Sequence, residues 1–291
     1  MQSESMVHDA INHLEHFSGD GDTLFFAHAN GYPVGSYRQL LQALTSCCSV
    51  VGMNQRPIWD QSPAPKRLDW QQLSEDLLDT VHATQSEPVW LMGHSMGAVV
   101  ATLAAASEPE AFRGLVLIDP VFFMPESIPE RQAQSDAVLD TMPLVARTLT
   151  RPERFDDPQS AFTFYRGKRS FQDFSDSVLM DYSRASLTPA EEGGYRLRYP
   201  RAWEAAAYRS APAVWDALRA ISLPVLGLRG ETSDVLMPEV FELWGETQPQ
   251  AALETLTGGH LLPLEYSAET AVRIKQFLKQ DRTPLDQHEA G

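Results

Sequence analysis

The sequence predicts an α/β protein in which a mostly parallel sheet is covered by helices on both faces. Short apolar runs alternate with stretches of helical periodicity, which is the pattern of parallel sheets. A G-x-S-x-G pentapeptide lies between one such run and the helix that follows it. About a hundred residues in the second half of the chain interrupt the alternation. The 291 residues, of which 43% are hydrophobic, suffice for one sizeable core with an added cap.

The elements follow from apolar runs too short for helices and from apolar residues spaced three or four apart. Expected strands span 23–29, 48–54, 89–92, 114–120, 223–230 and 252–259. Expected helices span 36–44, 70–84, 98–106, 238–246 and 267–280. Because parallel strands end at one edge of a sheet, functional groups are expected at their carboxyl ends.

The interruption of this pattern predicts the division of the chain. Residues 122–222 are rich in aromatic residues, proline and charge, contain no convincing buried strand, and are expected to form a helical cap or lid. Residues 1–121 and 223–280 are then the two parts of the core. The polar tail, 281–291, is expected to be disordered.

The pentapeptide Gly93-His94-Ser95-Met96-Gly97 favours a nucleophilic serine. A serine on a sharp strand-to-helix turn has its hydroxyl pushed clear of the sheet. Glycine is needed two residues before and after it, because strand and helix nearly touch there. An ordinary glycine turn is the alternative interpretation.

A serine hydroxyl needs a general base, and among eight histidines His260 is the strongest candidate. It follows the last expected strand and two glycines, where a loop reaches the strand-end edge. His94 is expected to point away from Ser95 and to serve packing.

Two carboxylates compete to orient that histidine. Asp234 follows the strand 223–230, and Asp119 ends the strand 114–120. Chain order favours Asp234, with Asp119 as the alternative and Glu231 a distant third. Either aspartate could instead be a helix cap or a turn residue.

An oxyanion formed at Ser95 needs two backbone N–H donors. The first is expected from Met96, directly after the serine. The second is expected from the loop after the strand 23–29, with Asn30 preferred and Tyr32 as the alternative. His28 is expected to anchor this loop.

These motifs together resemble the α/β-hydrolase-fold serine hydrolases that carry a helical cap. "HANGYP" is similar to their oxyanion loop, "GHSMGA" to their nucleophile elbow, "LRGETSDVLMP" to their acid loop and "GGHLLPLE" to their histidine loop. The resemblance implies a cap inserted after the sixth strand, with the first two strands shortened or poorly marked. Some lipases and acyl-thioester hydrolases of this superfamily carry the acid on the earlier strand, where Asp119 lies.

The resemblance implies hydrolysis of a small-molecule carboxylic ester through an acyl-enzyme, without cofactor or metal. Hydrolysis of acyl thioesters, removal of a terminal residue from a peptide, and carbon–carbon bond hydrolysis remain alternatives. A ligand-binding receptor on the same fold is the non-enzymatic alternative. The basic stretch "YRGKR" at 165–169 is expected to belong to a helical surface with ion pairs. If it lined the entrance to the site instead, it would favour anionic thioesters.

The net charge of −16 disfavours nucleic acid and anionic membranes as partners. No apolar run approaches the length of a membrane-spanning helix, and the first residues do not resemble a secretory signal. The two adjacent cysteines, Cys47 and Cys48, rarely pair in such a position and fit a reducing compartment. A cytoplasmic protein without membrane insertion is therefore expected.

Overall fold

A seven-stranded sheet forms the centre of the molecule in the computed structural model, which describes residues 2–280. The expected disordered tail, 281–291, lies outside these residues. The strand order is β1-β3-β2-β4-β5-β9-β10, and every pairing is parallel except that of β1 with β3. The strands are β1 (Leu14–Phe17), β2 (Thr23–Ala27), β3 (Ser49–Met53), β4 (Val89–His94), β5 (Phe112–Ile118), β9 (Val225–Gly230) and β10 (Ala252–Leu256).

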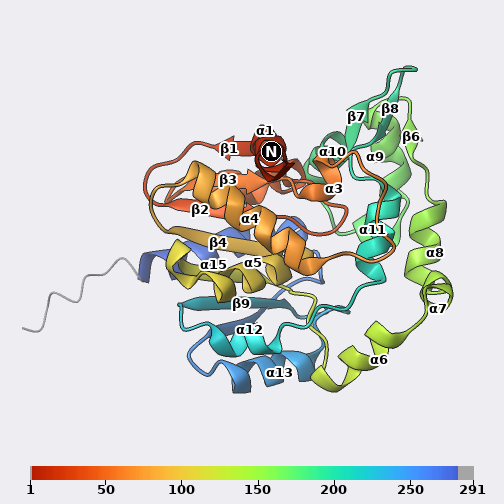
Figure 1. The fold of residues 1–291 in the computed structure, drawn as a ribbon. Coiled ribbons are helices and arrows are strands. Elements are labelled where there is room, and N and C mark those ends of the chain that lie inside the picture. The colour runs from red at the N-terminus through yellow and green to blue at the C-terminus, as the bar shows by residue number, and fades with distance from the viewer. Residues whose placement is uncertain (1, 281–291) are drawn as a thin grey trace, which may run out of the picture.

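Helices cover both faces of this sheet (Figure 1). One face carries α4 (Trp70–Thr84), α5 (Met96–Ser107), α12 (Trp215–Ala220) and α13 (Pro238–Thr247). The other carries α2 (Arg38–Leu44), α14 (Leu262–Glu265) and α15 (Ser267–Gln280). The remaining helices of the core are α1 (Gln2–Asn12), which packs on α4, and α3 (Arg56–Trp59).

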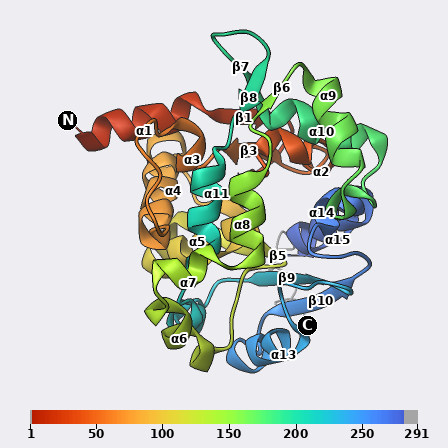
Figure 2. The same ribbon diagram turned by 90° about the vertical axis from the view of Figure 1, so that its right-hand side faces the viewer.

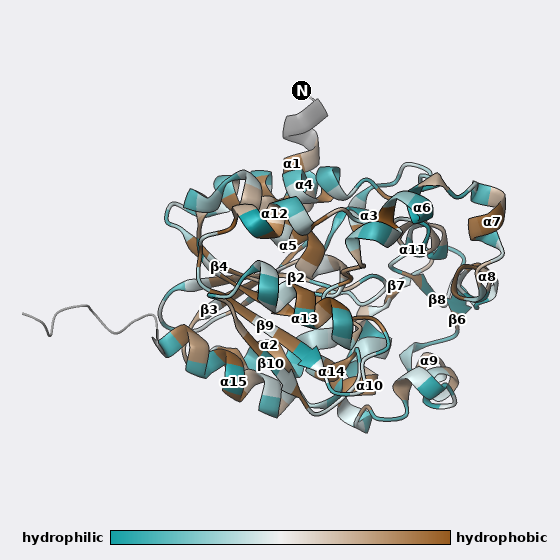
Figure 3. Ribbon diagram, turned by 90° about the horizontal axis from the view of Figure 1, so that it is seen from below, coloured by the Kyte–Doolittle hydropathy of each residue, from teal (hydrophilic) through white to brown (hydrophobic). Residues whose placement is uncertain are grey.

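The central strands are predominantly apolar because both of their faces are buried. Along β4, Val89 and Leu91 join the core on the α5 side, whereas Trp90 and Met92 join the core on the α15 side. Figure 3 shows the same division: apolar colour is concentrated on the strands, and the outer helices carry both colours. The expected mostly parallel sheet with flanking helices is therefore confirmed.

Residues 122–222, called the inserted segment below, follow β5 and return to the sheet at β9. Figure 2 shows its helices α6, α7, α8 and α11 in front of the sheet, with α9 and α10 to one side. The helices of the segment, apart from α12, are α6 (Ile128–Ala133), α7 (Asp136–Asp140), α8 (Pro143–Thr150), α9 (Pro158–Arg166), α10 (Asp176–Ala185) and α11 (Arg201–Tyr208).

Two details differ from the expectation. The insertion follows the fifth strand in chain order rather than the sixth, because one strand rather than two precedes β2. The segment also contains a small antiparallel sheet of β6 (Arg154–Phe155), β8 (Tyr195–Leu197) and β7 (Leu187–Pro189). Strands of two or three residues leave too little periodicity to be recognised in a sequence.

Within residues 2–280, no helix is both long enough and apolar enough to cross a bilayer.

Candidate active site

Ser95 lies on the turn between β4 and α5 in a strained backbone conformation. Its φ of 55° and ψ of −114° are unfavourable for a residue with a Cβ atom. The Ser95 N–H donates to the Ile118 carbonyl at 2.9 Å, which holds the turn against β5. The conformation is the one that the sequence predicts for this turn.

The two glycines of the pentapeptide are required by close backbone approaches. A Cβ atom on Gly93 would lie 2.3 Å from the Gly97 carbonyl oxygen. A Cβ atom on Gly97 would lie 2.1 Å from the Ala27 carbonyl oxygen at the end of β2. Both distances are far shorter than real contacts, so the steric reason given for these glycines is confirmed.

Three side chains from separate strand ends form a continuous hydrogen-bonded chain. The Ser95 Oγ lies 2.9 Å from the His260 Nε2, and the His260 Nδ1 lies 2.7 Å from the Asp119 Oδ1. Because a carboxylate only accepts, the His260 Nδ1–H donates to Asp119, and Nε2 is left to accept the serine proton. Asp119 is fully buried, whereas the His260 side chain is 19% exposed.

The carboxylate beside His260 is that of Asp119, the alternative candidate, and not that of Asp234. Asp234 is exposed and is not the carboxylate that His260 contacts. The loop after β9 turns the hydroxyl of Ser233 inward and leaves Asp234 facing outward. Because β5 is the neighbour of β4 in the sheet, the residue directly after β5 lies near Ser95. The preference for Asp234 is corrected on this ground, and Glu231 is likewise exposed.

Asp119 accepts two further hydrogen bonds from the strand β9 and the loop after it. The Gly230 N–H donates to Oδ2 at 2.7 Å, and the Ser233 hydroxyl lies 2.6 Å from Oδ1. Both carboxylate oxygens are therefore satisfied although the residue is fully buried.

His94 does more than pack. Its Nε2 lies 2.8 Å from the His260 carbonyl oxygen, and its Nδ1 lies 2.7 Å from the Tyr37 hydroxyl. Since Nε2 must donate to a carbonyl, Nδ1 accepts from Tyr37. Burial holds the pKa of His94 well below its usual range, so the ring is neutral. The position of His94 inside the pentapeptide gave no signal of this long-range contact with the histidine loop.

The loop expected to supply an oxyanion donor runs directly beside the elbow. His28 anchors it as expected: Nδ1–H donates to the Ala29 carbonyl at 2.7 Å, and Nε2 accepts the Gln55 N–H at 3.0 Å. The Tyr32 N–H donates to the Ala29 carbonyl at 3.2 Å and is already engaged. Among the described residues, the N–H groups of Asn30 and Met96 have no such acceptor. Asn30 is thereby favoured over Tyr32.

The inserted segment packs on this same loop. The Asn30 side-chain amide donates to the Glu204 carbonyl at 3.1 Å, and the Tyr199 hydroxyl lies 3.9 Å from the Met96 sulfur. Glu204 is 5% exposed and pairs with Arg151. Burial raises the pKa of Glu204, and the Arg151 guanidinium opposes this shift. The inserted segment therefore contacts the loop through the Glu204 carbonyl and the elbow through Tyr199.

The basic stretch at 165–169 is engaged within the inserted segment itself. The Arg166 guanidinium donates to Asp176 at 2.7 Å and to the carbonyls of Phe171 and Phe174. The Lys168 ammonium lies 4.3 Å from the centre of the Phe164 ring. These contacts fit a helical surface with ion pairs and do not favour the alternative of an entrance for anionic substrates.

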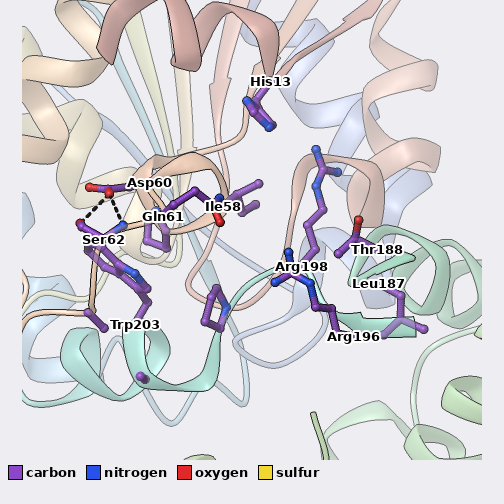
Figure 4. A pocket seen from close by; sticks show the side chains of 14 residues that line it. His13, Ile58, Asp60, Gln61, Ser62, Leu187, Thr188, Arg196, Arg198 and Trp203 are labelled. Carbon is purple, nitrogen blue, oxygen red and sulfur yellow. Dashed lines mark hydrogen bonds between the residues drawn. The ribbon is translucent and has the colours of Figure 1, made fainter. Parts of the chain in front are cut away.

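A groove of about 520 Å³ lies at the boundary between the core and the inserted segment, away from these residues (Figure 4). Its core side includes His13, Ile58 and Asp60, and its other side includes Arg198 and Trp203. Ser95, Asp119 and His260 do not line it. It is therefore separate from the hydrogen-bonded chain described above.

Residues 24–273 match the model of the alpha/beta hydrolase family, and the chain belongs to that family. It is similar to rat monoglyceride lipase, with 35% identity over 111 residues that span 36% of this chain and 37% of that protein. Human monoglyceride lipase is 34% identical over the same shares. The match thus spans little more than a third of the length of these relatives.

Solved structures resemble the whole chain. An E-2-(acetamidomethylene)succinate hydrolase superimposes with a TM-score of 0.75 at 21% identity, covering 91% of this chain and 94% of its own. A thioesterase domain from the curacin biosynthetic pathway gives a TM-score of 0.72 at 19% identity, covering 90% and 94%. At this identity the likeness shows the fold alone.

Proposed function

We propose that the protein hydrolyses carboxylic esters through an acyl-enzyme on Ser95. The observation that carries this proposal is the continuous chain from the Ser95 Oγ through His260 to the buried Asp119 carboxylate. His260 takes the serine proton as the hydroxyl attacks the ester carbonyl, and Asp119 stabilises the imidazolium that forms. His260 then protonates the leaving alcohol and activates the water that releases the acid.

The backbone N–H groups of Met96 and Asn30 stabilise the oxyanion in this mechanism. Met96 begins α5, where an N–H group has no partner within the helix, and Asn30 lies on the adjacent loop. The inserted segment acts as a cap over the two parts of the core, 1–121 and 223–280, because Glu204 and Tyr199 pack on the oxyanion loop and the elbow.

The similarity to monoglyceride lipases supports an ester as the substrate. Thioester, peptide and carbon–carbon hydrolysis use the same three side chains and remain to be compared with it. The site has no need of a metal or cofactor for this reaction, because the serine, the histidine and the aspartate supply the nucleophile, the base and its orienting group.

Labelling with a fluorophosphonate and turnover of a panel of esters test the proposal. We expect rapid stoichiometric labelling of the wild-type protein at Ser95 and hydrolysis of esters graded in acyl length, faster than of matched thioesters and amides. Ser95→Ala deletes one oxygen atom and should abolish both readouts, with turnover lower by several orders of magnitude and an unchanged fold. Hydrolysis at the wild-type rate by folded Ser95→Ala would refute the mechanism.

A further inference from the structure

The loop between β9 and α13 contributes a hydroxyl rather than a carboxylate to the site. Ser233 is 7% exposed, and its Oγ lies 2.6 Å from the Asp119 Oδ1. The same Oδ1 lies 2.7 Å from the His260 Nδ1. One carboxylate oxygen is thus shared between the histidine and the serine.

The direction of the Ser233 hydrogen bond is fixed by its other partners. The N–H groups of Val235 and Leu236 both donate to the Ser233 Oγ, each at 3.2 Å. With these two donors on its lone pairs, the hydroxyl has only its own proton left to offer, and Asp119 is a pure acceptor. Ser233 therefore donates to Asp119.

Asp119 is a buried carboxylate with an unfavourable backbone conformation. It is fully buried and has a φ of 41°, so both its charge and its backbone depend on the surrounding contacts. The Asp119 N–H donates to the Leu228 carbonyl at 2.7 Å, and the Asp119 Oδ2 accepts a hydrogen bond from the Gly230 N–H. The Asp119 Oδ1 faces the histidine, and it is contacted by two side chains, His260 and Ser233.

We propose that Ser233 is a positioning residue of the reaction, acting through Asp119. Its donated hydrogen bond fixes the Oδ1 lone pair toward the His260 Nδ1–H and shares the negative charge of that oxygen. This inference rests on the proposed function, because it assigns Asp119 the role of orienting a general base.

A serine-to-alanine change tests the role directly. Ser233→Ala removes one hydrogen bond to a charged group, so kcat should fall roughly 10- to 100-fold with little change in KM. The acid limb of the pH profile of kcat/KM should move to higher pH, because Asp119 then carries more negative charge toward the imidazolium. Ser233→Thr keeps the hydroxyl and should restore most of the loss. Asp234→Asn, one residue away and exposed, is the matched control and should leave both readouts unchanged.

An exchange of the carboxylate between the two positions is a sharper test. The Ser233 Oγ and the His260 Nδ1 both lie within hydrogen-bonding distance of the Asp119 Oδ1, so a carboxylate at position 233 would bring a negative charge close to His260. We expect the double change Asp119→Asn and Ser233→Asp to recover at least about tenfold in kcat over Asp119→Asn alone, since moving a charged partner back beside the histidine restores part of the lost stabilisation. The pair Asp119→Asn and Ser233→Asn has the same size without the charge and should show no recovery.

A proton NMR signal separates this proposal from the proposed function. The His260 Nδ1–H donated to Asp119 should resonate far downfield in the wild-type protein, shift in Ser233→Ala and return in Ser233→Thr. A folded Ser233→Ala protein with wild-type kcat, pH profile and downfield signal would overturn the role of Ser233. Absence of fluorophosphonate labelling in the wild-type protein would instead refute the proposed function, and the downfield signal would still report on Ser233.

Discussion

Ser95 and Asp119 are the residues other than glycine with positive φ in the described part of the chain. Such a conformation costs on the order of 1–3 kcal/mol and persists where neighbours over-determine it. Both backbones are held by hydrogen bonds to the next strand, from Ser95 to Ile118 and from Asp119 to Leu228. The strained backbone positions are therefore Ser95 and Asp119, which lie at the two ends of the hydrogen-bonded series Ser95–His260–Asp119. Strain is expected for residues whose side chains must be held at a fixed place.

Two single changes at this scale distinguish the aspartates. Asp119→Asn removes the charge that orients His260 and stabilises its cation, so kcat should fall around ten-thousandfold. Asp234→Asn changes an exposed side chain and should cost less than about twofold. Steady-state kinetics on both purified variants, with circular dichroism to verify folding, make the comparison. The reverse order of losses would return the acid role to Asp234.

The elbow formed by β4 and α5 is the element on which the site depends. Helix α5 begins directly after Ser95, and glycine and alanine near its start let it approach the end of β2. The Gly97 Cβ position faces backbone atoms of Ala27 and His28, which lead into the oxyanion loop. The position of α5, the loop after β2 and the turn at Ser95 are therefore coupled through one close approach.

Gly97→Ala should displace α5, the loop after β2 and the turn at Ser95 together. A Cβ atom there would lie 2.1 Å from the Ala27 carbonyl oxygen and 2.8 Å from that of His28, so backbone must move. We expect the free energy of unfolding to fall by about 2–3 kcal/mol, as is typical of overpacking, and kcat to fall with it.

Gly245→Ala is the matched control for this change. Gly245 lies in α13, where a Cβ atom would meet the Leu253 Cδ1 at an ordinary 3.5 Å. Alanine there should stabilise the helix by up to about 1 kcal/mol without affecting turnover. Urea unfolding measures both variants, and equal stability of Gly97→Ala and wild type would contradict the steric account.

At the scale of the whole molecule, buried neutral histidines link the site to the stability of the fold. His28 and His94 are both completely buried and hydrogen-bonded, one under the oxyanion loop and one behind His260. Burial lowers the pKa of His28 to about 4 and that of His94 well below its usual range. His28 cannot take up a proton at Nε2 in the native state without losing the hydrogen bond from the Gln55 N–H.

These shifts predict a loss of stability in mild acid. Between the unfolded pKa of about 6.5 and the folded value of about 4, the unfolded chain binds a proton at His28 that the native state does not. Stability is therefore fully present above pH 6.5 and falls as the pH drops toward 4. His28 alone should cost about 2 kcal/mol by pH 5, and His94 adds to this loss.

Urea unfolding at pH 7 and pH 5 measures this dependence. His28→Gln is less stable at pH 7 because it loses hydrogen bonds to the loop, but its stability should depend less on pH than that of the wild type. An identical pH dependence in the two proteins would show that His28 titrates normally in the native state.

The sequence by itself determined the features that depend on neighbours in the chain. The parallel core follows from apolar runs and helical periodicity, and the elbow around Ser95 follows from a pentapeptide at a strand–helix junction, because each is local. His260 could be selected by the same logic, since it directly follows a strand and two glycines.

Only the tertiary structure decided which carboxylate meets the histidine. Asp119 and Asp234 both follow parallel strands, so strand-end position could not separate them. The order of strands brings β5 beside β4, and the turn after β9 points Ser233 inward and Asp234 outward. The contacts of His94 with His260, and of Glu204 with Asn30, likewise join residues more than 150 positions apart. Such pairings depend on how the strands and the inserted segment pack, which local periodicity does not encode.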